Sequence, residues 1–199
     1  MRIALCLQAD HDADPKQPAM TLPFFKYHPD PLATGSVAAS DAACACCGQA
    51  RGFVYTASVY AVDDVEPLCP WCIADGSAAA RFDACFSDDC GVGACGDGLP
   101  VPPEVVEIVS RRTPGYATWQ QEQWWTHCGD AGMFLGPAGR AELEAFGPEA
   151  AAAIRAEAGL PEGPAWNALW RALDKDHGPT AYVFRCTVCG ALGGYYDSL

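Results

Sequence analysis

Two Cys-x-x-Cys pairs constrain the fold of this chain more than any other feature. Cys44 and Cys47 form the first pair, which Gly48 follows, and Cys69 and Cys72 form the second after 21 intervening residues. Each turn points two sulfur atoms at one place, and the glycine lets the backbone reverse sharply. Two such pairs at this separation are typical of a tetrahedral zinc site. We therefore predict that these four cysteines bind a structural Zn2+ ion.

The second pair, in the stretch LCPWC, also has the spacing of a redox dithiol. A redox Cys-x-x-Cys usually follows a buried strand in a βαβ unit. The residues before Cys69, VDDVEPL, are acidic and contain proline, which is not the composition of a central strand. Zinc binding is therefore favoured, and a thiol oxidoreductase that uses Cys69 and Cys72 is the weaker alternative. Cys46 lies between two predicted ligands, and we expect it not to bind the metal.

The order of predicted elements favours a treble-clef arrangement in a zinc module spanning 40–86. The first cysteine pair forms a knuckle, and the aromatic and β-branched stretch FVYTASVYAV (53–62) predicts a hairpin. A helix that begins near Cys72 would follow and supply two ligands from its first turn. The positive end of a helix dipole also stabilises a negatively charged zinc-thiolate centre.

A second cysteine cluster combines residues from the middle of the chain with a cysteine pair near its C-terminus. Cys186 and Cys189 repeat the knuckle spacing, but one pair cannot close a tetrahedral site. The remaining candidates lie in WWTHCGDAG, and we predict that Cys128 and His127 complete a second metal site. If Asp130 or a water molecule were the fourth ligand instead, the site would be open, as catalytic zinc sites are. The alternative without metal is a cysteine turn with Cys128 buried and inert.

The remaining cysteines and one histidine carry weaker signals. Cys85, Cys90 and Cys95 have no ligand spacing among themselves. We expect Cys85 in the core and Cys90 and Cys95 as thiols of a loop. His28, in KYHPDP, is expected to be a hydrogen-bonded turn residue rather than a ligand.

Outside the cysteine clusters the sequence predicts an α+β chain with a helical middle. Helices are expected at PPEVVEIVSRRT, GRAELEAFG, PEAAAAIRAEAG and PAWNALWRALDKD, within a helical region of 102–176. A knuckle hairpin should close the chain at 180–198. We predict one domain over 20–199, because aromatic and proline content rises sharply after Met20, and a disordered extension over 1–19.

The net charge limits the kinds of partner, and the lack of targeting segments in the sequence predicts the compartment. The formal net charge is −13, which repels the phosphates of nucleic acid. The same charge favours a protein partner, especially a basic one. No apolar run reaches the roughly 20 residues that span a bilayer, and the N-terminus lacks a signal-peptide pattern. We therefore predict a cytoplasmic protein, in which 12 cysteines point to metal or redox chemistry.

From Met20 onward the chain resembles the CbrC family, a group of uncharacterised bacterial proteins associated with tolerance to colicin E2. The resemblance is carried by FFKYHPDPLATGSV, CACCGQARGFVYT, LCPWCIADGSAAARFDA, RTPGYATWQQEQWWTHCGD and FRCTVCG. It implies a cytoplasmic zinc-binding protein. The family pattern often has a cysteine where this chain has Gly132, which gives His127 more weight as a ligand.

These observations predict a CbrC-type zinc protein with two zinc ions that acts through a protein partner, and they favour a non-enzymatic role. The resemblance implies that this role is in tolerance to colicin or another toxin. A zinc hydrolase with an open second site is the main alternative, because it needs only a metal-bound water and a nearby base. The sequence contains no glycine-rich phosphate loop, nucleophile elbow or His-Glu-x-x-His motif, and it assigns no small-molecule substrate.

Overall fold

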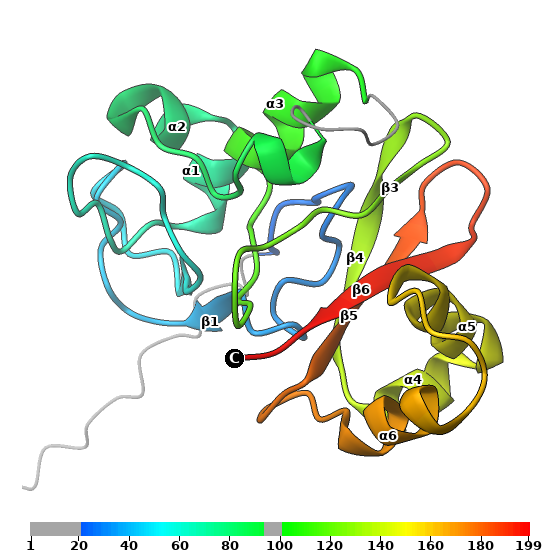
Figure 1. Ribbon diagram of the computed structural model, residues 1–199. Helices are drawn as coiled ribbons and strands as arrows, with labels where there is room; N and C mark the ends of the chain where they lie inside the picture. Colours follow the sequence, from blue (N-terminus) through cyan, green and yellow to red (C-terminus); the bar gives the residue numbers. More distant parts are fainter. Residues whose placement is uncertain (1–20, 94–100) are drawn as a thin grey trace, which may run out of the picture.

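The computed structural model describes residues 21–93 and 101–199, and it shows an α+β fold in two adjoining parts (Figure 1). The predicted extension over 1–19 and Cys95 lie outside these residues. Within them the elements run β1 (Val37–Ala39), β2 (Phe53–Tyr55), α1 (Pro70–Ala74), α2 (Ser77–Phe82), a 3-10 turn η1 (Cys90–Val92), α3 (Pro103–Arg112), β3 (Thr126–His127), β4 (Asp130–Ala138), α4 (Arg140–Phe146), α5 (Pro148–Glu157), α6 (Pro164–Ala172), β5 (Thr180–Cys186) and β6 (Leu192–Asp197).

The first part has the treble-clef order of a knuckle followed by a ligand-bearing helix, but its strand pairing differs from the prediction. The hairpin expected within 53–62 is wrong, because β2 pairs antiparallel with the upstream strand β1. The knuckle is therefore the connection between the two paired strands. Tyr60 instead forms an isolated bridge with Cys85, which is half-buried and lies after α2 rather than on it.

The single helix expected from Cys72 is two short helices. It begins earlier, at Pro70, with Cys69 as the N-cap residue of α1. Gly76 separates α1 from α2 with a φ of +80°, a left-handed conformation that glycine adopts without the steric cost of a side chain. The helix prediction is otherwise confirmed, since α3, α4, α5 and α6 all lie where the sequence placed them.

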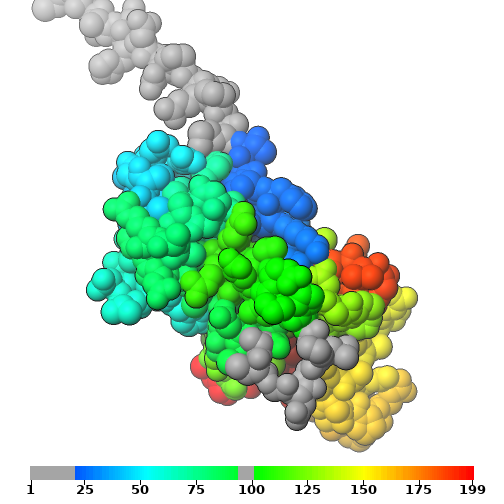
Figure 2. Space-filling view, turned by 90° about the horizontal axis from the view of Figure 1, so that it is seen from above, coloured from blue at the N-terminus to red at the C-terminus, as the bar shows by residue number. Residues whose placement is uncertain are grey.

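The second part is a four-stranded antiparallel sheet in the order β3-β4-β5-β6. Side chains of β5 alternate between its two faces, as the pleat requires. Ala181 and Val183 join the core under α4, α5 and α6, whereas Tyr182 and Phe184 join an aromatic core on the other face. Figure 1 shows these three helices on one side of the sheet, and Figure 2 shows them at the opposite end of the molecule from the cyan first part.

Two strands, β3 and β4, lie in the region 102–176 for which only helices were predicted. Their sequence, from Thr126 to Ala138, contains glycine and proline and has few β-branched residues, so its strand propensity is low. The pairing with β5 stabilises this segment as a strand. The stretch 114–125 before β3 forms neither helix nor strand. Across 21–93 and 101–199, no helix is long and apolar enough to cross a membrane.

Candidate metal centres

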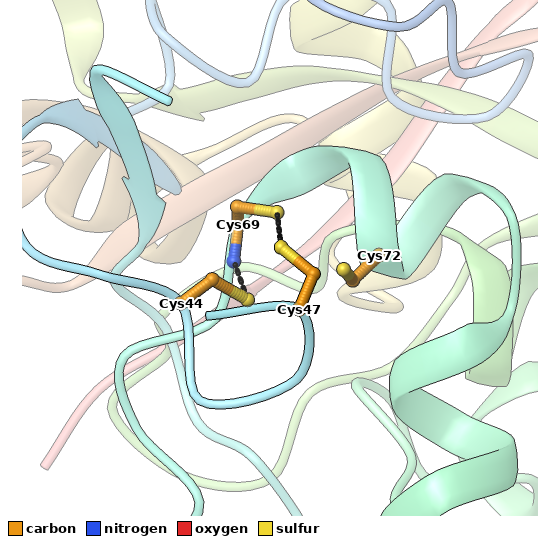
Figure 3. Close-up of side chains that lie close together, drawn as sticks. All are labelled: Cys44, Cys47, Cys69 and Cys72. Carbon is orange, nitrogen blue, oxygen red and sulfur yellow. Dashed lines mark hydrogen bonds between the residues drawn. The ribbon is translucent and has the colours of Figure 1, made fainter. Parts of the chain in front are cut away.

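Cys44, Cys47, Cys69 and Cys72 lie together in the first part of the chain. Their four sulfur atoms all lie within 4.8 Å of one another. Figure 3 shows that two side chains come from the knuckle and two from the start of α1, and that all four point inward. The sulfurs of Cys47 and Cys69 are 3.9 Å apart. The structure therefore brings together all four ligands predicted for the first site.

Backbone hydrogen bonds hold the knuckle in place. Gly48 donates its N–H to the carbonyl of Cys44 at 2.7 Å, with a φ of +70° that favours glycine. Cys44 in turn donates to the carbonyl of Gln49 at 3.0 Å. Ala45 donates to Pro67 at 2.8 Å, which fixes the knuckle against the segment that leads into α1. These hydrogen bonds fix the main chain that carries the sulfur atoms of Cys44 and Cys47.

The electrostatics of this group favour a cation. Burial raises the pKa of Cys44, but backbone N–H groups, including that of Cys69 at 3.2 Å from its sulfur, outweigh burial and hold the pKa at about 7. Burial raises the pKa of Cys69 to about 11 and also raises the pKa of Cys72. Four adjacent thiolates repel one another unless a positive ion lies between them. Metal binding at this group would therefore release protons.

Cys46, which lies between two of these residues, does not belong to the group. Its buried sulfur lies 3.6 Å from the hydroxyl of Ser77 on α2, and its carbonyl accepts a hydrogen bond from Arg81. The expectation that Cys46 is not a ligand agrees with this geometry.

His127, Cys128, Cys186 and Cys189 form a second group of the same kind. Their ligand atoms also lie within 4.8 Å of one another. Nδ1 of His127 is 3.2 Å from the sulfur of Cys128 and 3.5 Å from that of Cys189. The backbone N–H groups of Val188 and Cys189 each lie 3.4 Å from the sulfur of Cys186 and donate to it. Burial opposes ionisation of Cys186, but these donors and His127 lower its pKa to about 6.

A tight turn explains how the neighbours His127 and Cys128 face the same point. The turn joins β3 to β4, and its two central residues, Cys128 and Gly129, have φ values of +55° and +72°. Positive φ at both positions is the signature of a type I′ hairpin. Because Gly132 of β4 pairs with Cys186 at the end of β5, this turn meets the Cys186–Cys189 turn at the same edge of the sheet.

The carboxylate of Asp130, the alternative fourth ligand, forms hydrogen bonds with side chains outside the second group. It accepts hydrogen bonds from Lys26 and Tyr27, each at 2.7 Å, and from the hydroxyl of Thr187 at 2.6 Å. Thr187 lies within the Cys186–Cys189 turn, so Asp130 ties that turn to the N-terminal segment. It positions the group and is not part of it.

Trp125 supports the His127 ring, a role that the sequence did not reveal. The two rings stack with centroids 5.2 Å apart and planes 8° apart. The indole lies over Gly132 and Gly193, where an added Cβ would meet Trp125 at 2.8 and 2.0 Å. The glycine at 132 thus makes room for the tryptophan that orients the histidine. The pattern Trp-x-His at neighbouring positions on one strand face is the only sequence signal for this contact.

Substituting Gly193 is therefore expected to disturb the second group from a distance. Gly193→Ala should lower the free energy of unfolding by roughly 1–3 kcal/mol, because the methyl group overlaps the Trp125 ring. Thermal denaturation checks this, and the double variant Gly193→Ala/Trp125→Leu should recover part of the loss, because the smaller side chain removes the clash. A Gly193→Ala protein with unchanged melting would contradict this packing.

His28, Trp124 and Cys90 lie outside the two groups and have structural positions. His28 is fully buried and hydrogen-bonded, as expected of a turn residue. Trp124 is buried in the aromatic core, where its indole N–H donates to Gly132 at 2.8 Å. Cys90 begins the turn η1 and lies outside both groups. It is disulfide-bonded, so the expectation that it is a free loop thiol is wrong.

The second group differs from the first in exposure. Cys128 and Cys189 are exposed, whereas Cys44, Cys69 and Cys72 are buried. Cys128 is therefore not the buried, inert thiol of the alternative without metal.

Comparison with known proteins places the chain in a family. The profile described as "Uncharacterised protein family (UPF0167)" matches residues 22–198. The chain belongs to the UPF0167 family. It is 47% identical to the UPF0167 protein PA1536 of Pseudomonas aeruginosa over 178 residues. The matched region covers 88% of this chain and 96% of that relative. The UPF0167 proteins Mb2317 of Mycobacterium bovis and MT2352 of Mycobacterium tuberculosis are each 47% identical over 182 residues, covering 88% of this chain and 93% of each relative. No solved structure matches this UPF0167 chain.

Proposed function

We propose that this UPF0167 protein binds two structural zinc ions per chain and has no catalytic metal. The observation that carries the proposal is that each group offers four soft or imidazole ligands within 4.8 Å, which is a complete tetrahedral set. Thiolate and imidazole ligands suit zinc, whereas magnesium and calcium prefer oxygen. Cys44, Cys47, Cys69 and Cys72 would hold one ion, and His127, Cys128, Cys186 and Cys189 the other.

The same completeness argues against the two enzymatic alternatives. A zinc hydrolase keeps a coordination position for water, and four protein ligands at the second group leave none. The oxygen ligand that would have opened the site, Asp130, is hydrogen-bonded to three other side chains. A thiol oxidoreductase needs an unligated thiolate, and Cys69 and Cys72 share their group with two further sulfurs.

X-ray absorption at the zinc edge tests the structural assignment. The two sites together are expected to show seven sulfur ligands and one light-atom ligand with the outer-shell scattering of an imidazole ring. A second nitrogen or oxygen ligand, or a light-atom ligand without that ring scattering, would contradict closed coordination and restore the hydrolase alternative.

The two ions should also differ in how easily they are removed. The second site has two exposed thiolates at the tips of hairpins, so a chelator can approach it directly. Addition of a chelator is expected to release one zinc per chain several-fold faster than the other. Thiol alkylation followed by peptide mass spectrometry should find Cys128 and Cys189 labelled before Cys44 and Cys69. Labelling in the reverse order would contradict the assignment.

We further propose that the protein is cytoplasmic and acts through a protein partner with a basic surface. The formal net charge of −13 supports this, because opposite charge accelerates and orients association. The resemblance to the CbrC family suggests a role in tolerance to a toxin such as colicin E2. Titration of the purified protein against the colicin nuclease domain at low and high salt tests this partner. Binding that weakens with salt is expected, and no binding at low salt would rule that partner out.

A further inference from the structure

A cavity of about 300 Å³ lies where the two parts of the chain meet. Its walls come from the loop after residue 33, the end of β2, the irregular segment 116–119, strands β4 and β5, and the loop before β5. Neither metal group contributes a residue to it. A cavity of this size is at the lower end of those that hold small molecules. Its chemistry differs from that of the metal centres and follows from the hydrogen bonds of its lining.

His28 is not among the lining residues, but its ring contacts the hydroxyl of Thr34, which is one of them. Nδ1 of His28 is 2.7 Å from the carbonyl oxygen of Pro114, which can only accept, so Nδ1 carries a proton. Burial keeps the ring neutral by lowering its pKa to about 4. Nε2 is then an acceptor, and the Thr34 hydroxyl, 2.6 Å away, must donate to it. Thr34 therefore presents only lone pairs to the cavity.

Two further threonines in the lining also donate their hydroxyl protons to protein acceptors. The hydroxyl of Thr56 donates to the carbonyl of Gly35 at 2.6 Å, and that of Thr118 donates to the carbonyl of Gln120 at 3.0 Å. Each has given its only proton to the protein. The carboxylate of Asp176 also lines the cavity and can only accept. Four lining side chains thus present acceptors, whereas Ser36, whose hydroxyl lies 3.4 Å from that of Thr34, and Lys175 can donate. The four acceptors would pair with a ligand that brings hydrogen-bond donors.

The apolar side consists of aromatic rings, among them Tyr116, Trp119 and Tyr182. Trp119 is fixed by a 2.8 Å hydrogen bond from its indole N–H to Thr180 and by contact with Gly178. The electron-rich faces of aromatic rings attract cations. Acceptors on one side and aromatic rings on the other are the complement of an ammonium group.

One lining residue, Lys175, carries a positive charge. Its ammonium group lies 4.0 Å from Glu142, and Asp174 and Asp176 flank it in the chain. The three carboxylates outweigh this one cation, and the net charge of the protein is −13. The local potential therefore favours a positive ligand.

We propose that this cavity binds a small organic cation that carries a primary ammonium group. The ammonium N–H groups would donate to the threonine oxygens and Asp176, and the attached apolar group would lie against the aromatic rings. This proposal is independent of the metal sites.

Titration of the full-length zinc-loaded protein with 2-phenylethylamine, followed by NMR of labelled amides, tests the proposal. Shifts are expected at residues 34–36, 56–57 and 116–119 and at the indole N–H of Trp119. Binding should be at least about tenfold tighter than that of 2-phenylethanol, since a hydrogen bond to a charged group exceeds that to a neutral one. Equal affinity for the alcohol, stronger binding of phenylacetate, or no shifts in this region would overturn the proposal.

Substitutions at the exposed residues Asp176 and Lys175 have opposite expected effects, so a general loss of folding cannot imitate the result. Asp176→Asn should weaken amine binding about two- to fivefold, and Lys175→Gln should strengthen it by a similar factor. Thr118→Val, which removes an acceptor, should weaken it about tenfold. Glu149→Gln on α5 changes the net charge equally but lies outside the lining, and it should have no effect. Weaker binding in Lys175→Gln would show that the lysine, not the acceptors, selects the ligand.

Discussion

The Cys47→Ser variant is expected to retain one zinc ion per chain and to lose the folded structure of residues 40–86. Structural zinc contributes roughly 10–16 kcal/mol of apparent binding free energy in small zinc-binding peptides. That exceeds or matches the whole net stability of a typical domain, about 5–15 kcal/mol. The hydrophobic core around the first site includes Cys44, Cys69 and Cys72, and Cys47 packs against it, so loss of the ion also disrupts packing. Elemental mass spectrometry and thermal denaturation measure the two effects.

Cys46→Ser is the matched control for this experiment. It makes the same chemical change one residue away, at a buried sulfur that contacts Ser77 and lies outside the group. This variant should keep two zinc ions and lose no more than about 1–2 kcal/mol of stability. If Cys47→Ser kept both ions and the melting temperature of the parent protein, the first site would be wrongly assigned.

Replacing Glu122 is expected to stabilise the protein at alkaline pH. This carboxyl group is only 5% exposed, and its Oε1 has no hydrogen-bond partner in the two described ranges. Burial, with a smaller effect of Asp88, raises its pKa from 4.5 to about 7. The folded protein therefore holds this proton more tightly than the unfolded chain does. Stability should fall as the pH rises from about 4.5 to 7, by roughly 3 kcal/mol, and then level off.

The Glu122→Gln variant isolates this effect from the protonation of metal ligands, which is common to both proteins. The difference in unfolding free energy between variant and parent should be near zero at pH 5 and reach roughly 3 kcal/mol in favour of the variant at pH 8. Urea denaturation at several pH values measures it. A difference that does not change with pH would mean that Glu122 is not buried in this way.

The local part of the site could be predicted from the sequence, because a Cys-x-x-Cys turn depends on neighbouring residues. The two knuckles follow from spacing and glycine, and a helix after the second cysteine pair was also expected, although it begins at Pro70 rather than near Cys72. The place of His127 is different, because it depends on the pairing of Gly132 with Cys186 across 54 residues of sequence. Spacing suggested His127, but only the sheet register places its ring among the three sulfurs.

The errors arose where tertiary contacts override local preference. Strand β4 has the glycine and proline content of a loop, and its pairing with β3 and β5 makes it a strand. The stretch 53–62 has the aromatic and β-branched composition of a hairpin. Its first residues, Phe53–Tyr55, instead pair with β1, which lies before the knuckle in the chain. The buried state of Glu122 carries no sequence signal, because its neighbours Gln121 and Gln123 are polar and exposed.

The most direct test of two structural zinc sites is the metal content of protein purified without chelator, with reactive thiols counted in parallel. The proposal predicts two zinc ions per chain and seven ligand cysteines that react only after denaturation or metal removal. Absence of zinc, together with ready formation of a Cys69–Cys72 disulfide, would contradict it and favour thiol redox chemistry.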